Sequence, residues 1–306
     1  MKLVKSILII GNSGQVSQYL QTVLSTDYLV FATSRDDLDL ANTETIQTSL
    51  KALCDKHAPS IIINPAAYTA VDLAEQEQQL AHDVNARAVA EIGLFCAQFD
   101  IPIIHFSTDY VFDGNASTAY KEHDKTMPNG VYGKTKLDGE KALIESKASM
   151  VILRTAWVYS NLGKNFYNTM LNLSRTRDEL SVVYDQVGSP TYAGSIANAT
   201  KALVDVFIQQ GSILSKQQGI YNFTCQGQTS WCDFAKRIFE SHDRQILVHA
   251  IPSSEYPTPA KRPAFSVLDG TKLKEVFEIA LPCWQVALDD CVAETQSLYS
   301  ISITDS

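Results

Sequence analysis

The sequence predicts an α/β protein built on a doubly wound parallel sheet, with a smaller region in its C-terminal half. Short apolar runs alternate with helical patterns through the first half of the chain, and this alternation stops near residue 158. Runs of this length are typical of strands buried on both faces, as in a parallel sheet. Turn-forming residues then become frequent. We therefore divide the chain into residues 1–158, which hold the sheet, and 159–306, a loop-rich region with some segments returning to the sheet.

Each element follows from the apolar pattern. The first predicted helix comes directly after the first strand and carries Val16, Leu20, Val23 and Leu24 on one face. A longer helix precedes the fourth strand, with its apolar face formed by Leu80, Val84, Ala88, Ile92, Phe95 and Phe99. The predicted strands are residues 6–10, 28–32, 61–64, 101–106 and 151–154.

Composition narrows the class of protein. The 306 residues are 45% hydrophobic and 19% charged, with a net charge of −9. This balance argues against nucleic acid or an anionic membrane as a partner. Six cysteines form no C-x-x-C pair, so neither a zinc site nor a redox pair is indicated. The apolar run at residues 7–10 is too short for a signal peptide, so we expect a cytoplasmic protein with reduced thiols.

A glycine loop follows the first strand and opens the first helix. Gly11 would permit a tight turn, and Gly14 would let the backbone approach a pyrophosphate at the helix N-terminus. Ser17 stands where a third glycine would allow close packing of helix and strand. The alternative is an ordinary strand-to-helix turn, because the spacing is looser than G-x-G-x-x-G.

Hydroxyl side chains follow the fourth predicted strand, at Ser107 and Thr108. Ligands of open α/β sheets bind at the carboxyl ends of strands, where a hydroxyl can hold a carbonyl oxygen. The alternative is a helix N-cap, a position that Ser, Thr and Asp all favour.

Tyr132 and Lys136 are four residues apart in a predicted helix, so they share one face. A free tyrosine has a pKa of ~10, and a nearby ammonium lowers it toward neutral pH. The phenol could then act as a general acid. A solvated pair on a surface helix is the alternative. The order of nucleotide loop, hydroxyl pair, tyrosine and lysine favours a nicotinamide-dependent ketone reductase.

With these motifs the chain resembles the extended short-chain dehydrogenase/reductase superfamily and, within it, the dTDP-4-dehydrorhamnose reductases of dTDP-rhamnose biosynthesis. The resemblance covers nearly the whole chain, and its most specific string is Tyr-Pro-Thr-Pro-Ala-x-Arg-Pro at 256–263. It also rests on residues 64–72, 107–112, 132–136, 154–159, 165–166, 185–191 and 229–231. The resemblance implies a Rossmann-type fold, with the C-terminal half mainly binding substrate.

Roles follow from this resemblance residue by residue. Thr108, Tyr132 and Lys136 would be catalytic, and Lys136 would also hold the nicotinamide ribose together with Tyr132. The cofactor would be lined by Gly11, Gly14, Gln15, Val16, Ala66, Ala67 and Ser107. The deoxysugar would be faced by Val71, Tyr110, Trp157 and Asn165. Arg262 would contact a phosphate of the dTDP-sugar. By composition alone, Trp157 would instead be a core residue.

The resemblance leaves alternatives open. The substrate could be another nucleotide-linked 4-keto sugar, or the chain could be a non-catalytic regulatory subunit like the β subunit of methionine adenosyltransferase. Some relatives form dimers around a metal bound by surface glutamates. The matching stretches, 17–19 and 192–194, contain no glutamate, so we expect no metal site and, in any homodimer, no metal bridge.

The cofactor is expected to be NADPH, with NADH also accepted. In NAD-selective folds an acidic residue after the second strand binds the ribose 2′-hydroxyl, whereas a nearby arginine accommodates a 2′-phosphate. Here Ser34 and Arg35 follow that strand, and Asp36 is the first carboxylate. Ser34 could donate a hydrogen bond and Arg35 a charged fork to the phosphate.

Overall fold

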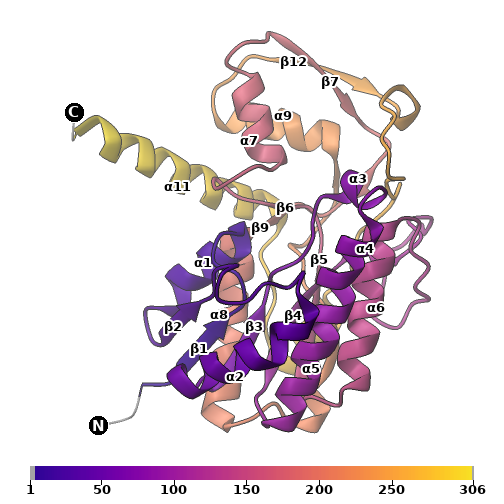
Figure 1. Ribbon diagram of the computed structural model, residues 1–306. Helices are drawn as coiled ribbons and strands as arrows, with labels where there is room; N and C mark the ends of the chain where they lie inside the picture. Colours follow the sequence, from indigo (N-terminus) through magenta and orange to yellow (C-terminus); the bar gives the residue numbers. More distant parts are fainter. Residues whose placement is uncertain (1–3, 305–306) are drawn as a thin grey trace.

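The computed structural model describes residues 4–304, and its centre is a six-stranded sheet with the order β10-β5-β4-β3-β1-β2 (Figure 1). Every pair of neighbouring strands in this sheet is parallel. The order in which successive strands are added reverses between β1 and β3, and such a switch point is where open α/β sheets bind ligands. The predicted doubly wound α/β fold is confirmed.

The elements have these bounds. The strands are β1 Ser6–Ile9, β2 Leu29–Ala32, β3 Ile61–Asn64, β4 Ile103–Thr108, β5 Met150–Thr155, β6 Val158–Tyr159, β7 Glu179–Val183, β8 Val187–Gly188, β9 Thr191–Tyr192, β10 Gly219–Asn222, β11 Thr229–Ser230 and β12 Leu247–Ile251. The helices are α1 Gln15–Leu24, α2 Ile46–His57, α3 Val71–Ala74, α4 Gln78–His82, α5 Ala88–Gln98, α6 Val131–Glu145, α7 Phe166–Leu173, α8 Ala193–Gln210, α9 Trp231–Ser241, α10 Thr271–Phe277 and α11 Trp284–Thr304.

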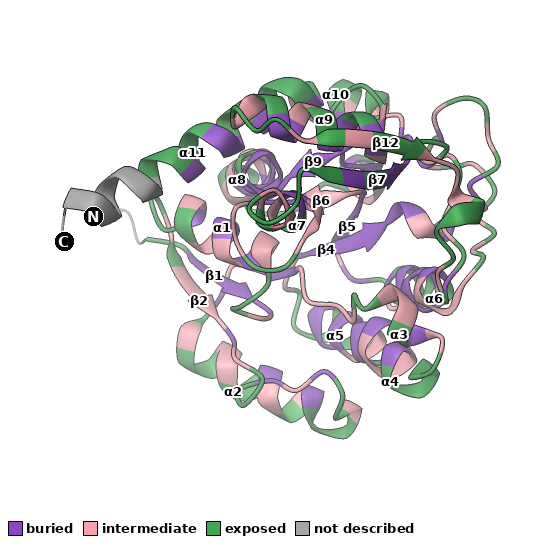
Figure 2. Ribbon diagram, turned by 90° about the horizontal axis from the view of Figure 1, so that it is seen from above, coloured by how far each residue is buried: buried purple, intermediate pink, exposed green. Residues whose placement is uncertain are grey.

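Alternation along β1 explains the two layers of helices. Ile7 and Ile9 pack in a core with residues of α1 and α8, whereas Leu8 and Ile10 pack with residues of α2, α5 and α6. Seen from above, buried strands occupy the centre and exposed helix surfaces the outside (Figure 2). Burial on both faces is why the strands read as continuous apolar runs in the sequence.

The prediction of one continuous helix before the fourth strand is wrong, because the segment is interrupted. A π-helical turn, Asp83–Arg87, separates α4 from α5, and it changes which side chains face inward. Leu80 and Phe99 are 39% and 41% exposed, so neither belongs to the core face. The carbonyl oxygen of Asn85 in this turn lies against Gly139 of α6, where an added Cβ would come within 2.1 Å of it. The π-helical turn therefore packs directly on the helix that carries Tyr132 and Lys136.

Segments of the C-terminal half return to the sheet layer. β10 pairs with β5, and α8 packs on α1. The remainder forms a smaller layer in which β7 pairs with β12 and α7 packs on α9, above the carboxyl ends of the strands (Figure 1). The division at residue 158 stays a prediction. None of the helices within residues 4–304 combines the length and apolar character needed to cross a bilayer.

Candidate active site

The glycine loop connects β1 to α1 at the switch point of the sheet. Gly11 has φ +84°, a left-handed conformation that favours glycine, and its N–H donates to Thr33 Oγ1 at 3.0 Å. The Ser17 hydroxyl donates to the Gly11 carbonyl, so this side chain ties the loop to α1. Gly14 begins α1 without a side-chain cap, and a Cβ there would meet nothing within 4 Å. The loop thus offers open space at a helix N-terminus, where an anion is favoured.

The loops after β1 and β3 meet across the switch point. A Cβ at Gly11 would lie 3.2 Å from the Cβ of Ala66. The Ala66 N–H donates to Asn64 Oδ1 at 3.2 Å, which shapes the turn leading to Ala67. Gln15 and Val16 start α1 beside Gly14. The side chain of Gln15 is engaged by the protein, because it donates to the Val158 carbonyl at 3.1 Å.

Ser34 and Arg35 lie just after β2, at the same edge of the sheet. Arg35 is exposed, but the Ser34 hydroxyl donates to Asp37 Oδ2 at 2.6 Å, and its N–H donates to the same oxygen at 2.8 Å. These hydrogen bonds lower the pKa of Asp37. This contact, which the sequence pattern does not predict, places a carboxylate beside the expected 2′-phosphate position.

Thr108 ends β4 and caps the short 3-10 turn Asp109–Val111, accepting from the Tyr110 N–H at 3.2 Å. The N-cap alternative is therefore correct in geometry, without removing the hydroxyl from the site. Thr108 Oγ1 also donates to Asp109 Oδ1 at 2.9 Å. Burial raises the pKa of Asp109 to about 6. The side chain of Thr108 is consequently fixed between two groups of the next turn.

Tyr132 lies in the first turn of α6, with its ring edge-to-face on Tyr110 at a centroid distance of 5.4 Å. Desolvation of the phenol raises its pKa, Asp109 raises it further, and a hydrogen bond with Thr108 partly offsets this. The expectation that Lys136 lowers the pKa of Tyr132 is therefore wrong for the protein without ligands. The raised pKa keeps Tyr132 protonated at neutral pH, the form a general acid needs.

Lys136 explains that difference, because its ammonium is directed at β4. Its Nζ donates to the Phe106 carbonyl at 2.7 Å and lies 3.4 Å from His105 Nε2. Burial lowers the pKa of Lys136 to about 8, and attraction to Glu140 opposes this change. Burial and the lysine lower the pKa of His105 well below its usual value. The ammonium thus has two neighbours on β4, the Phe106 carbonyl that accepts from it and the His105 ring.

Ser107 is close to Thr108 along the strand, but its hydroxyl is engaged elsewhere. It donates to Glu140 Oε1 at 2.5 Å, and both side chains are buried. Glu140 in turn pairs with Arg154 of β5. The sequence pattern does not predict this pair, although Glu140 stands one helical turn after Lys136.

A cavity of about 1010 Å³ lies between the sheet and the C-terminal layer. Tyr110, the ring neighbour of Tyr132, forms part of its wall, as do Trp157, Trp231 and Arg262. Its volume is at the upper end for a small-molecule site.

Trp157 joins β5 to β6 with φ +48°, an uncommon conformation for a bulky residue. Its ring stacks on Trp231 at a centroid distance of 3.5 Å and an interplanar angle of 4°. Gly188 also lies against this indole, where an added Cβ would be 2.4 Å from Cε2 of Trp157. Trp157 is half-buried and lines the cavity, so it is not simply a core residue.

The other expected sugar-facing residues differ in position. Asn165 caps α7 and donates to the carbonyls of Ser160 at 2.8 Å and Leu162 at 3.0 Å, so its amide holds the loop. Val71 begins α3 and is half-buried. Arg262 lines the cavity, but its Nη2 donates to Asp72 at 2.7 Å. The substrate-binding roles of these residues stay predictions.

The stretches that hold glutamates in metal-bridged relatives carry Tyr19 and Tyr192 here. Both hydroxyls donate to Glu294 Oε2 of α11, and Tyr19 does so at 2.8 Å. These contacts connect α1, β9 and α11. Among residues 4–304, no group of three or more His, Cys, Asp or Glu side chains is arranged to hold a metal ion.

Comparison with known proteins agrees with this geometry. The model for the RmlD substrate binding domain matches residues 5–297. A dTDP-4-dehydrorhamnose reductase from Sinorhizobium fredii is 41% identical over 283 residues, covering 91% of this chain and 94% of that protein. The crystal structure of a dTDP-4-dehydrorhamnose reductase from Clostridium acetobutylicum has a TM-score of 0.87 at 35% identity, covering 95% of this chain and 99% of that one. The reductase from Bacillus anthracis, solved in complex with NADP, has the same TM-score at 31% identity and covers 95% and 100% of the two chains. The chain therefore belongs to the dTDP-4-dehydrorhamnose reductase family.

Proposed function

We propose that this protein reduces the 4-keto group of dTDP-4-dehydrorhamnose with NADPH to give dTDP-L-rhamnose. One observation carries the proposal: Thr108 and Tyr132 are hydrogen-bonded at the carboxyl end of β4, Lys136 contacts Phe106 of the same strand, and Tyr110, the ring neighbour of Tyr132, lines the cavity. A reductase acting on a nucleotide-sugar needs its catalytic residues close to the cofactor loop and to the cavity that binds the sugar. The names of the relatives support the same reaction.

The residues of the glycine loop fit a dinucleotide. Gly14 leaves open space at the start of α1, where no side chain caps the helix. Gly11 adopts the left-handed backbone conformation that the tight turn before this space requires. The amides of the first helical turn would hold the pyrophosphate. Arg35 is free to approach a 2′-phosphate, whereas Asp37 opposes it. When bound, NADPH supplies the hydride that reaches C4 of the sugar.

The chain's own residues supply the proton and the orientation. Thr108 is fixed beside Tyr132 and would hold the ketone oxygen. Tyr132 is protonated at neutral pH and would transfer its proton to that oxygen as the alkoxide develops. The ammonium of Lys136, one helical turn after Tyr132 on α6, would stabilise the resulting phenolate. The layer above the strand ends would exclude water from the reacting atoms.

The test is oxidation of NADPH by the purified protein when it is mixed with dTDP-4-dehydrorhamnose. We expect stoichiometric loss of the reduced cofactor, and a product that proton NMR identifies as dTDP-L-rhamnose. Turnover only with another nucleotide-linked 4-keto sugar would change the substrate. No turnover with any of them would overturn the proposal and favour a regulatory role.

Three further statements belong to this proposal. The C-terminal half, residues 159–306, mainly selects the nucleotide-sugar, because most of the cavity wall comes from it. Any homodimer forms without a bridging metal, since Tyr19 and Tyr192 occupy Glu294. The protein works in the cytoplasm on a small-molecule substrate, without nucleic acid or membrane as a partner.

A further inference from the structure

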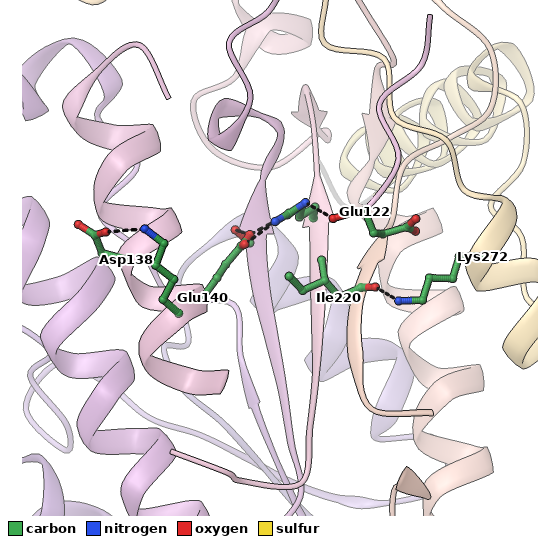
Figure 3. A network of polar contacts seen from close by, with 8 residues as sticks. Glu122, Asp138, Glu140, Ile220 and Lys272 are labelled. Carbon is green, nitrogen blue, oxygen red and sulfur yellow. Dashed lines mark hydrogen bonds and ion pairs between the residues drawn. The ribbon is translucent and has the colours of Figure 1, made fainter. Parts of the chain in front are cut away.

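A buried ion pair lies behind the proposed catalytic residues. Arg154 of β5 and Glu140 of α6 are 2% and 1% exposed and make two parallel contacts, Nη2 to Oε2 at 2.6 Å and Nε to Oε1 at 2.9 Å. Figure 3 shows the polar network to which Glu140 and Glu122 belong. A buried ion pair like that of Arg154 and Glu140 has a large desolvation cost, and well-packed apolar residues would often be as stable. Its place beside Ser107, on the same helix as Lys136, points to a role other than general stability.

The pair joins four parts of the fold. Glu140 accepts from the Ser107 hydroxyl of β4, and Arg154 Nη1 donates to the Glu122 carbonyl at 3.2 Å. The guanidinium also lies 5.0 Å from the ring centroid of Phe112, a cation–π contact. The carboxylate of Glu140 is therefore held in one position relative to β4, β5 and the segment 112–122.

Glu140 is also one helical turn after Lys136 on α6. Burial disfavours the lysine's charge, and Glu140 is the group whose attraction opposes it. The other titratable or charged groups near Lys136 are His105 on β4, Tyr132 on α6 and Arg154 behind Glu140 on β5. From the π-helical turn, Asn85 contributes an uncharged amide bonded to Thr135.

We propose that Glu140, held in place by Arg154, is a positioning residue of the reaction, which keeps Lys136 in its ammonium form and fixes Ser107 beside Thr108. The inference rests on the proposed function, because it assigns the charged lysine to the catalytic step. A positioning role predicts a result that a purely structural role does not. Losing the carboxylate must change the pH at which activity falls, whereas a purely structural loss would lower activity equally at every pH.

The experiment compares kcat/KM against pH for the wild type, Glu140→Gln and Glu140→Asp. We expect wild-type activity to fall as pH rises through the titration of Lys136, near pH 8. In Glu140→Gln this alkaline limb should move down by about one pH unit, the effect of losing one nearby opposite charge. Glu140→Asp keeps the charge and should keep the limb close to that of the wild type. Glu145→Gln, an exposed glutamate on the same helix, is the matched control and should change nothing.

The effect of Glu140→Gln on the pH profile must be distinguished from its effect on folding stability. Glu140→Gln leaves Arg154 buried and unpaired, which is destabilising. The double variant Glu140→Gln with Arg154→Met removes both charges and should move the limb in the same direction. Carbon-13-labelled lysine would report the titration of Lys136 by NMR without any turnover. A limb and a lysine titration that stay at their wild-type pH in folded variants would overturn the inference. An inactive wild type would instead overturn the proposed function, with the NMR titration still deciding the role of Glu140.

Discussion

Arg262 Nη2 lies 2.7 Å from Asp72 Oδ2, so the loop of the C-terminal half is ion-paired to α3 of the sheet-bearing half. Arg262 Nη1 also donates to the Tyr110 hydroxyl at 3.3 Å, and Tyr110 contacts the Tyr132 ring. The Ala260 N–H donates to the other oxygen of Asp72 at 3.1 Å. The arginine that the sequence assigns to a phosphate thus has protein partners on the cavity wall.

For Arg262→Ala we expect the KM for the dTDP-sugar to rise about tenfold, the equivalent of ~1.4 kcal/mol. NADPH affinity should not change, because the glycine loop is remote in the fold. Asp72→Asn is the informative companion. If Arg262 acts by holding the loop, Asp72→Asn reproduces the rise; if it contacts phosphate directly, the freed arginine leaves the KM unchanged or lower. An unchanged KM in Arg262→Ala would contradict any role in substrate binding.

Tyr132→Phe should keep NADPH affinity and lose turnover by ~10²–10⁴, the range for one general acid. The ring contact with Tyr110 survives in phenylalanine, so the fold should not change. Steady-state rates and a fluorescence titration with NADPH measure the two effects separately. Near wild-type turnover would mean that another group supplies the proton.

The sequence predicts the sheet well because buried parallel strands are apolar throughout. All five predicted strands exist; the strand at 61–64 has the predicted bounds, and the other four have at least one end shifted by one or two residues. The sixth strand of the sheet, Gly219–Asn222, is absent from the prediction, because it begins with glycine, ends with asparagine and has only two apolar residues between them. The π-helical turn was missed for a different reason. Its cause is tertiary, since Asn85 hydrogen-bonds both Tyr68 and Thr135, which no local pattern reveals.

The site was predicted by residue and spacing, but not by orientation. Helical spacing places Tyr132 and Lys136 on one face, and the structure does so. Helical spacing alone could not show that the ammonium of Lys136 is directed toward the Phe106 carbonyl and His105 on β4. Glu140 and its partner Arg154 are 14 residues apart and lie on different elements, so only the fold brings the two charges together.

Lys136→Met should remove one contribution to the pH dependence of stability. The pKa of Lys136 is lowered by burial to about 8 in the folded protein, from about 10.4 when unfolded. Between these values the unfolded state binds more protons, so wild-type stability gains with rising pH, by at most about 1.4 kcal/mol per pH unit. The methionine variant lacks this gain. Denaturant unfolding of both proteins between pH 7.5 and 10 (a window set by the two pKa values) should show the difference rising in favour of the wild type. A constant difference would mean that Lys136 titrates normally.

Gly188→Ala should disturb the tryptophan stack that lines the cavity. The new Cβ would lie 2.4 Å from Cε2 of the Trp157 indole, and any movement of this ring disturbs its stack on Trp231, which has a centroid distance of 3.5 Å. We expect a loss of ~1–3 kcal/mol, typical of overpacking, and a higher KM for the dTDP-sugar. Gly163→Ala is a control for the loss of a loop glycine, although its φ of +67° adds strain of its own, with nothing within 4 Å of the new Cβ. A sugar KM that changes no more in Gly188→Ala than in Gly163→Ala would argue against the stack as part of the substrate site.

The preference for NADPH over NADH should be modest and should depend on the balance between Arg35 and Asp37. Arg35 is exposed at the end of β2 and can place its guanidinium beside a 2′-phosphate. Asp37 accepts two hydrogen bonds from Ser34, which lower its pKa and keep it charged at neutral pH. That carboxylate repels a phosphate and occupies the Ser34 hydroxyl that would otherwise donate to it. Arg35→Ala should therefore lower kcat/KM for NADPH but not for NADH, whereas Asp37→Asn should raise it for NADPH. The measurement is kcat/KM for both cofactors at one fixed salt concentration, because screening weakens exposed charge contacts. Opposite changes in the two variants are the expected signature, and an NADPH/NADH ratio that neither variant alters would place the selectivity elsewhere in the site.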